Sequence, residues 1–326
     1  MTTAERTAPR PTPAGPVQPR LLFINGFHRS GTTVMTSAVT EAVRGVTTTV
    51  SVLARHIPTL DAFLETLSDG TVDRGADRLH ITPQTAEEYG FLLHHRTGEH
   101  ALYGHPDGLR LLREHVAELA AEAPHATVVL KNPWEVGHEA QLLADFPDAR
   151  IIILRRRLAD IERSVDKALL RASSSAYFRA LDGDSEHYHR LRRHLGSRWK
   201  RPLLLWVLRL VARRRAWRLA ESVRELPLDR VAFLSYDELR ADPQAGAAWA
   251  AHLLDPQALA EAFTKHAFAE QSAPAPSSMV QRALDRRLQR AWTQARAEQV
   301  QAGIVAPATG VAGTGDRLAR TLSARA

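Results

Sequence analysis

A loop with the spacing of a phosphate-binding turn lies between Gly26 and Thr33. Gly26 and Gly31 follow an apolar run and precede residues at helical spacing. Glycines there let successive backbone N–H groups face one anion, and the next helix adds roughly half a positive charge. The lysine of nucleoside-triphosphatase loops is replaced by Thr32, and Arg29 stands inside the loop. The pattern predicts an anion-binding loop; the alternative is a strand-to-helix turn capped by threonines.

Two more basic residues follow apolar runs. Lys131 comes after residues 126–130, and Arg156 closely follows 150–154. The carboxyl ends of parallel strands border the crevice in which α/β folds bind ligands. A guanidinium suits a phosphate dianion, and a lysine that closes a buried strand needs an anionic partner. These residues are therefore candidates for binding the same ligand as the loop, although exposed cations at strand ends are the alternative.

Residues 29–33 read Arg-Ser-Gly-Thr-Thr and resemble the donor loop of one branch of the sulfotransferase family. In that family the loop binds the 5′-phosphosulfate of 3′-phosphoadenosine 5′-phosphosulfate (PAPS), and its basic residue faces the sulfate that is transferred. The resemblance implies that Arg29 has this role. It also implies that the rest of the loop supplies N–H and hydroxyl donors, from Ser30, Gly31, Thr32 and Thr33.

The segment 146–164 resembles the family's 3′-phosphate segment, where a strand ends at an arginine and a serine follows eight residues later. The resemblance implies that Arg156 and Ser164 bind the 3′-phosphate, although the usual Asp-Pro after the arginine is absent here. Residues 131–133, Lys-Asn-Pro, resemble the family's Lys-Asp-Pro or Lys-Ser-Pro. This implies that Lys131 lies near the sulfate and acts in catalysis together with Arg29.

The general base of the family does not carry over to this sequence. Where some relatives have a glutamate, residues 47–51 hold no carboxylate, and where others have a histidine, Pro133 stands. Four residues remain as candidates, although each is also typical of an ordinary polar surface position: His56, Glu88, Glu135 and His138. The histidines show no metal-binding spacing such as H-E-x-x-H. We therefore expect a PAPS-dependent reaction without a metal.

Apolar runs alternate with helical patterns along the chain. Strands are predicted over residues 20–25, 126–130, 150–154 and 230–234, and helices over 58–67, 87–95, 109–123, 186–225 and around 280–292. Residues 69–83 are expected to be irregular. This alternation predicts an α/β fold, a P-loop-like three-layer arrangement with a central parallel sheet flanked by helices. We expect one domain over 20–303, with disordered tails over 1–19 and 304–326.

The composition limits the classes of function. The 326-residue chain has a formal net charge of +7, which favours anionic ligands. Since there is no cysteine, disulfides, thiolate metal sites and cysteine nucleophiles are excluded. Residues 1–19 lack the apolar core of a signal peptide, and the apolar stretch 202–212 is too short to span a bilayer. We therefore expect a cytoplasmic protein.

The basic, tryptophan-bearing segment 198–218 allows two interpretations. We favour a core-facing helix with solvated arginines; the alternative is peripheral contact with an anionic membrane, which would present a lipid-linked acceptor. Two other functions remain open, a P-loop kinase or nucleotide hydrolase and a non-catalytic 3′,5′-ADP-binding protein. No nucleic-acid motif accompanies the charge, so no nucleic-acid partner is expected. The acceptor is left open among small molecules, carbohydrates, lipids and peptide tyrosines.

Overall fold

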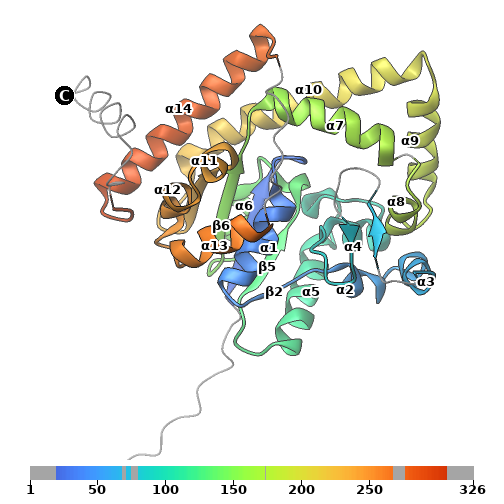
Figure 1. Ribbon diagram of the computed structural model, residues 1–326, viewed down its shortest axis with the longest axis horizontal. Coiled ribbons are helices and arrows are strands. Elements are labelled where there is room, and N and C mark those ends of the chain that lie inside the picture. Colours follow the sequence, from blue (N-terminus) through green and yellow to red (C-terminus); the bar gives the residue numbers. More distant parts are fainter. Residues whose placement is uncertain (1–19, 68–70, 75–79, 173, 267–275, 307–326) are drawn as a thin grey trace, which may run out of the picture.

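The computed structural model describes residues 20–67, 71–74, 80–172, 174–266 and 276–306. At its centre is a parallel five-stranded sheet with the order β2-β5-β1-β6-β7 (Figure 1). Its strands are β1 (Leu21–Gly26), β2 (Val46–Thr47), β5 (Val128–Lys131), β6 (Arg150–Arg155) and β7 (Val231–Ser235). All four predicted strands are confirmed. β2 was not predicted, because two residues are too few to show a periodic pattern.

Helices cover both faces of this sheet, which confirms the predicted three-layer α/β fold. One face packs against α1 (Thr32–Ala42), α11 (Tyr236–Ala241), α12 (Pro243–Ala247), η4 (Ala248–Ala250) and α13 (Pro256–His266). The other packs against α5 (Gly108–Glu122), α6 (Glu139–Asp145), the start of α7 (Leu158–Ala172), the end of α10 (Lys200–Ser222) and α14 (Met279–Gln301). Alternate residues of β6 serve the two cores, because successive strand side chains point to opposite faces.

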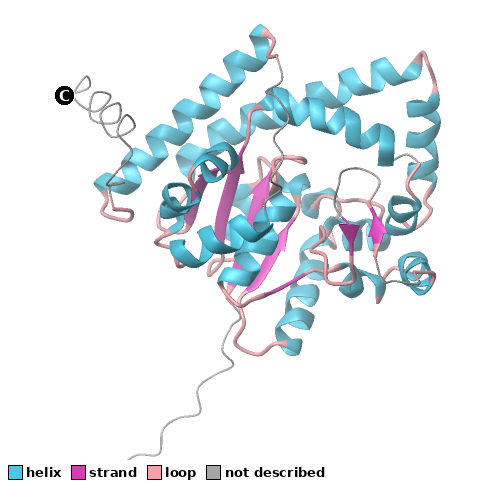
Figure 2. Ribbon diagram, viewed as in Figure 1, coloured by secondary structure: helices cyan, strands magenta, loops and turns pink. Residues whose placement is uncertain are grey.

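A third, smaller core lies beside the sheet. It is formed by α2 (Val50–Ala54), α3 (Pro58–Glu65), α4 (Gly90–Thr97), α8 (Ala176–Leu181) and the strands β3 (Val72–Asp73) and β4 (His80–Ile81). β3 and β4 pair antiparallel, apart from the central sheet (Figure 2). The prediction that residues 69–83 are irregular is therefore wrong for the described part of that segment.

The basic segment 186–225 is not one helix. It divides into α9 (Glu186–Gly196), α10 and the 3-10 helix η3 (Val223–Glu225), with a break at residues 197–199. Within α10 the buried residues are confined to the last turns, at Ala216, Leu219 and Ala220. The prediction of a core-facing helix over 198–218 is thus wrong for its first half, where Leu203 is 62% and Trp206 56% exposed.

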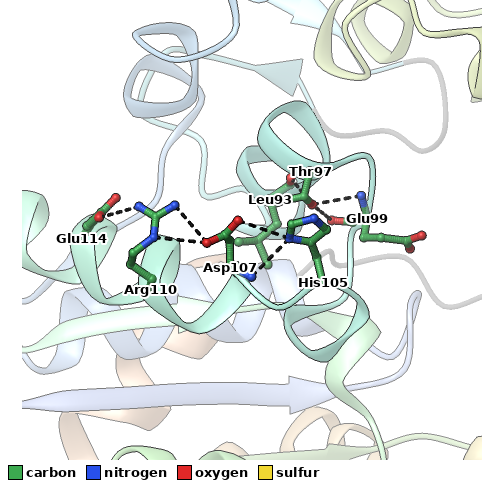
Figure 3. A network of polar contacts seen from close by, with 7 residues as sticks. All are labelled: Leu93, Thr97, Glu99, His105, Asp107, Arg110 and Glu114. Atoms are coloured by element: carbon green, nitrogen blue, oxygen red, sulfur yellow. Dashed lines mark hydrogen bonds and ion pairs between the residues drawn. The ribbon is translucent and has the colours of Figure 1, made fainter.

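A polar network fixes the connection from α4 to α5 (Figure 3). The Thr97 hydroxyl donates to the Leu93 carbonyl at 2.8 Å and accepts from the Glu99 N–H at 3.1 Å, which closes the end of α4. Arg110 contacts Asp107 at 3.3 Å, within the first turn of α5. The short 3-10 helix η1 (Leu102–Gly104) lies between these contacts, and the His100 carbonyl before it accepts from Asn132, next to the end of β5, at 3.0 Å.

The packed chain extends slightly beyond the predicted boundary at residue 303. Ile304 packs against the core next to α13, and Val305 is buried in it. Those two residues correct the prediction of a tail from 304 onward. The rest of that predicted tail, residues 307–326, and the predicted tail 1–19 lie outside the described residues.

Candidate active site

The loop after β1 makes a tight turn into α1. The N–H of Ser30 donates to the Phe27 carbonyl at 3.0 Å, and the chain takes left-handed backbone angles at Arg29 (φ 69°) and Gly31 (φ 99°). A Cβ atom on Gly31 would lie 2.4 Å from the ring of Tyr236, so no other residue fits this position without movement. The loop is therefore a preformed turn that opens a helix, as predicted.

Ser30 has the environment expected of a residue that meets a ligand. Its side chain is fully buried, and its hydroxyl has no hydrogen-bond partner among the described residues. A buried hydroxyl without a partner is costly, because it has lost its hydrogen bonds to water. An anion in the turn, which the start of α1 also favours, would satisfy it.

Arg156 and Ser164 come from a different part of the chain and reach the same loop. Arg156 Nη1 donates to the Arg29 carbonyl at 2.9 Å, and Arg29 Nε donates to the Ser164 hydroxyl at 3.1 Å. The Arg156 guanidinium also lies over the Tyr236 ring, 5.1 Å from its centroid, while its Nε is buried with no partner among the described residues. The structure thus joins the two segments that the sequence suggested separately.

Lys131 completes this group from the neighbouring strand. β5 pairs with β1 so that Lys131 stands opposite Ile24, directly before the loop. Its side chain is 0% exposed, and its Nζ donates to the Thr33 hydroxyl at 2.7 Å. We call residues 26–33 with Lys131, Arg156 and Ser164 the anion edge. It concentrates cations and N–H groups at the carboxyl ends of β1, β5 and β6, where α/β sheets bind ligands.

The anion edge opens into a cavity of about 660 Å³. Five of the predicted residues line it directly: Arg29, Gly31, Thr32, Thr33 and Arg156. Ser30, Lys131 and Ser164 stand behind that surface and contact or brace the loop. The volume lies within the range typical of sites for drug-sized ligands and cofactors.

Glu88 is the one of the four candidate bases that lines this cavity. Glu135 is buried under the site, where it accepts from the Leu102 N–H at 2.7 Å, and burial raises its pKa to about 7. His56 pairs with a glutamate of α5 at 3.0 Å, and His138 lies against Tyr103, away from the cavity. The geometry therefore favours Glu88 for proton transfer.

Sequence reasoning assigned no role to His28, which lies beside Glu88. Its Nδ1 is 3.8 Å from Glu88 Oε1, and its ring meets Trp134 edge-on at 4.7 Å. Its Nε2 is buried with no partner among the described residues. Loss of solvation lowers the pKa of His28 to about 4, so its imidazole is neutral at pH 7. The pKa of Glu88 is lowered: burial raises it, but attraction to protonated His28 at low pH and to the cations Lys131 and Arg74 outweighs that effect.

Histidines distant in sequence also gather in this structure. His94 and His100 stack with ring centroids 4.0 Å apart, and their Nε2 atoms lie 3.5 and 3.6 Å from Asp182 Oδ1. His100 and Asp182 also line the cavity, and His100 stacks on Trp134, the ring that His28 contacts. A second group with ligand atoms within 4.8 Å of one another consists of His56, His115 and Glu118. Linear spacing did not reveal either group, and the expectation of a metal-free reaction stays a prediction.

Comparisons with known proteins agree with this geometry. Residues 19–255 match the sulfotransferase family. The fold is shared with the crystal structure of sulfotransferase STF9 from Mycobacterium avium, with a TM-score of 0.51 and 17% identity over 87% of this chain and 76% of that one. Sulfotransferase STF1 from Mycobacterium tuberculosis H37Rv gives a TM-score of 0.50 and 17% identity over 83% and 76%.

No curated protein matches the sequence. The family match covers the strands and loops that build the anion edge, from β1 through β7. Together with the shared fold, it places this chain among enzymes that transfer sulfuryl groups from a sulfonate donor to small molecules. The chain belongs to the sulfotransferase family.

Proposed function

We propose that this sulfotransferase uses PAPS as its donor and transfers the sulfuryl group to a hydroxyl or amine of its acceptor. The observation that carries the proposal is the pair of hydrogen bonds from Arg156 to Arg29 and from Arg29 to Ser164. PAPS carries a 3′-phosphate and a 5′-phosphosulfate on one ribose, so its binding needs two anion sites a few ångströms apart. The anion edge offers these sites, since the buried Ser30 hydroxyl and Arg156 Nε have no partner among the described residues.

The residues of the anion edge have distinct tasks in this reaction. The acceptor oxygen or nitrogen bonds to sulfur while the bond from sulfur to the 5′-phosphate oxygen breaks, and 3′,5′-ADP leaves with the electron pair. Arg29 and Lys131 stabilise the charge that develops on that oxygen, together with the N–H groups of the loop. As in phosphoryl transfer, positioning and electrostatics supply most of the catalysis.

His28 and Glu88 are the pair proposed to take the acceptor proton. The neutral imidazole has its Nε2 available, and the Glu88 carboxylate at 3.8 Å would stabilise the imidazolium that forms. This resembles a histidine–carboxylate pair in other transfer enzymes, where the carboxylate orients the ring and stabilises its charged form. Neither residue stands at the positions that serve as base in relatives.

Calorimetric titration with 3′,5′-ADP, beside ATP with Mg²⁺, tests the donor assignment. Metal-independent binding of 3′,5′-ADP that is much tighter than binding of ATP supports the proposal. The reverse pattern would favour the P-loop kinase or nucleotide hydrolase. Binding of 3′,5′-ADP without release of 3′,5′-ADP from PAPS in the presence of any acceptor would favour the non-catalytic binding protein.

The exposed first half of α10 supports peripheral contact with a membrane through residues 198–218. Trp199 is 87% exposed, and Leu203 and Trp206 are also largely exposed, amid arginines and a lysine. Apolar and aromatic side chains flanked by basic ones favour anionic lipid surfaces. Among the described residues, no helix is long and apolar enough to cross a bilayer. Co-sedimentation with vesicles of anionic and of zwitterionic lipid tests this contact.

A further inference from the structure

The cavity has two walls that differ in chemistry and in the elements from which they come. One wall comes from the small core beside the sheet and, next to the rings of Phe91 and Phe178, carries five polar residues: Gln84, Thr85, Glu88, His100 and Asp182. These side chains can donate and accept hydrogen bonds, as a ligand rich in hydroxyl groups requires. His28 of the anion edge meets this wall at Glu88, with its Nδ1 3.8 Å from Glu88 Oε1. A polar group bound here would place its hydroxyl between the proposed base and the sulfuryl donor.

The other wall is apolar and follows α7 beyond Ser164. Five residues of α7 line the cavity at helical spacing: Ile161, Val165, Ala168, Leu169 and Ala172. At about 1.5 Å per residue, the stripe from Ile161 to Ala172 is roughly 16 Å long. Its last two turns lie past Ser164, the last donor-binding residue on the helix. A nucleotide held at Arg156 and Ser164 therefore leaves this stretch uncovered.

The helices that follow α7 complete this apolar wall. Leu208, Val211 and Ala212 of α10 line the same cavity, as does Leu191 of α9. Figure 1 shows α7, α10, α9 and α8 forming a frame on one side of the molecule. We call the α7 stripe with these four residues the apolar wall. It is open to the outside at Val211, which lines the cavity and is also 44% exposed.

We propose that the acceptor is an amphiphile, with a hydroxyl-bearing polar head and an aliphatic chain that lies along the apolar wall. This inference rests on the proposed function, because the head must meet the sulfuryl group at the anion edge. A purely polar acceptor would leave the α7 stripe in water. A single aromatic ring is too short to cover the roughly 10 Å of helix from Val165 to Ala172. When an aliphatic chain lies on the apolar wall, the surface of the chain and the surface of the wall are both removed from water, which drives binding.

The position of the wall also indicates how such an acceptor enters. The exposed apolar residues of α10 continue outward from Val211 toward Leu203 and Trp206. Val207 and Leu210, between these residues, are 42% and 41% exposed, and the Arg209 side chain beside them is 40% exposed. Leu170 of α7, 41% exposed, lies in the same group of helices. The exposed apolar residues of α10 thus begin next to the apolar wall, at Val211.

Chain-length dependence tests the proposal. Hexyl, octyl and decyl β-D-glucosides, kept below their micelle concentrations, would be titrated calorimetrically into protein saturated with 3′,5′-ADP. Each methylene that enters the wall is expected to strengthen binding roughly three- to fourfold. Affinity that is the same for all three glucosides, or no binding of any, overturns the inference. It leaves the proposed donor intact if 3′,5′-ADP still binds.

Two tryptophan substitutions act as a length gauge along the stripe. Ala168→Trp is expected to abolish the increase in glucoside affinity from hexyl to decyl. Ala172→Trp, one turn further along the helix, should keep the increase in affinity from hexyl to octyl and abolish the increase from octyl to decyl. Arg171→Trp adds the same ring on the exposed side of α7 and should change nothing. Unchanged 3′,5′-ADP affinity and melting temperature show that each variant is folded. Equal chain-length dependence in all three variants would contradict the proposal.

Discussion

The anion edge and the apolar wall line one cavity but are held in different ways. The anion edge is made of residues at strand ends, the loop after β1 and Ser164 of α7, linked by hydrogen bonds of 2.7–3.1 Å. The apolar wall comes from α7, α9 and α10, and its side chains offer no hydrogen bond to a ligand. The first can fix a reacting group in position. The second can select a ligand by size and hydrophobicity only.

This difference separates two properties of the enzyme. Directional, charged contacts change strength as charge moves during the reaction, so the anion edge controls rate. Apolar contacts are the same in the ground state and the transition state, so the wall controls which acceptor binds. Substitutions at the anion edge should therefore alter turnover or donor affinity by large factors. Substitutions on the exposed helices should alter affinity for apolar partners and little else.

The largest effect is expected at Arg29. Arg29→Ala should reduce the release of 3′,5′-ADP from PAPS by roughly 10²-fold or more, the loss typical of one donor to a developing oxyanion. The rate would be followed chromatographically at saturating PAPS. Ser164→Ala, which removes the partner of Arg29 Nε and a proposed 3′-phosphate contact but no charge beside the sulfate, is the comparison and should be milder at saturating PAPS. Equal rates for wild type and Arg29→Ala would exclude a role of this residue in the chemical step.

The next effect concerns binding alone. Arg156→Ala should weaken the affinity for 3′,5′-ADP by about 1.5–3 kcal/mol, or roughly 10- to 100-fold, because one charge-assisted hydrogen-bonding partner is lost. Calorimetry with 3′,5′-ADP measures it. Arg157→Ala is the control, since Arg157 does not line the cavity. If Arg157→Ala weakened binding and Arg156→Ala did not, the register of the 3′-phosphate segment would be wrong.

Most of the anion edge could be predicted from the sequence because its determinants are local. An apolar run followed by Gly26, Arg29 and Gly31 can form few structures other than a strand, a tight turn and a helix. Lys131 and Arg156 each close a strand, and the parallel pairing of β5, β1 and β6 brings them to one edge. The proximity of these residues follows from topology, so it required no knowledge of side-chain packing.

The rest depended on contacts between distant segments. His28 and Glu88 are sixty residues apart and meet only because α4 packs beside the sheet. Similarly, the sequence of α10 carries apolar residues around much of its circumference, so its pattern did not show which side would be buried. In the structure only the last turns of α10 are buried. Other apolar residues of α10, which helical periodicity alone would assign to a core, line the cavity instead.

The pH dependence of turnover tests whether His28 takes the acceptor proton. With its pKa lowered to about 4 by loss of solvation, the imidazole stays neutral from pH 6 to 8, and the rate should be flat there and fall to half near pH 4. Because the unfolded chain binds this proton near pH 6.5, the fold loses stability as pH falls below that value. Rates would therefore be divided by the folded fraction from near-UV circular dichroism. A half-maximal rate near pH 6.5 would point to a solvated histidine instead.

The smallest effect on stability is expected at Trp206. Substitution of this residue also tests whether the exposed part of α10 contacts lipid. Since its side chain is 56% exposed, Trp206→Ser should change the free energy of unfolding by less than about 0.5 kcal/mol. It should nevertheless weaken binding to anionic vesicles roughly tenfold, because an aromatic ring no longer enters the lipid interface.

Trp217 of the same helix provides the contrast for this substitution. It is 45% exposed, but its ring contacts the Arg287 guanidinium at 3.5 Å and its Nε1 donates to Glu221 at 2.8 Å. Trp217→Ser should therefore cost about 1 kcal/mol of stability, since it breaks these contacts, and leave vesicle binding nearly unchanged. The opposite pattern, with stability lost at Trp206 and vesicle binding lost at Trp217, would mean that the exposed part of α10 serves the fold rather than a lipid surface.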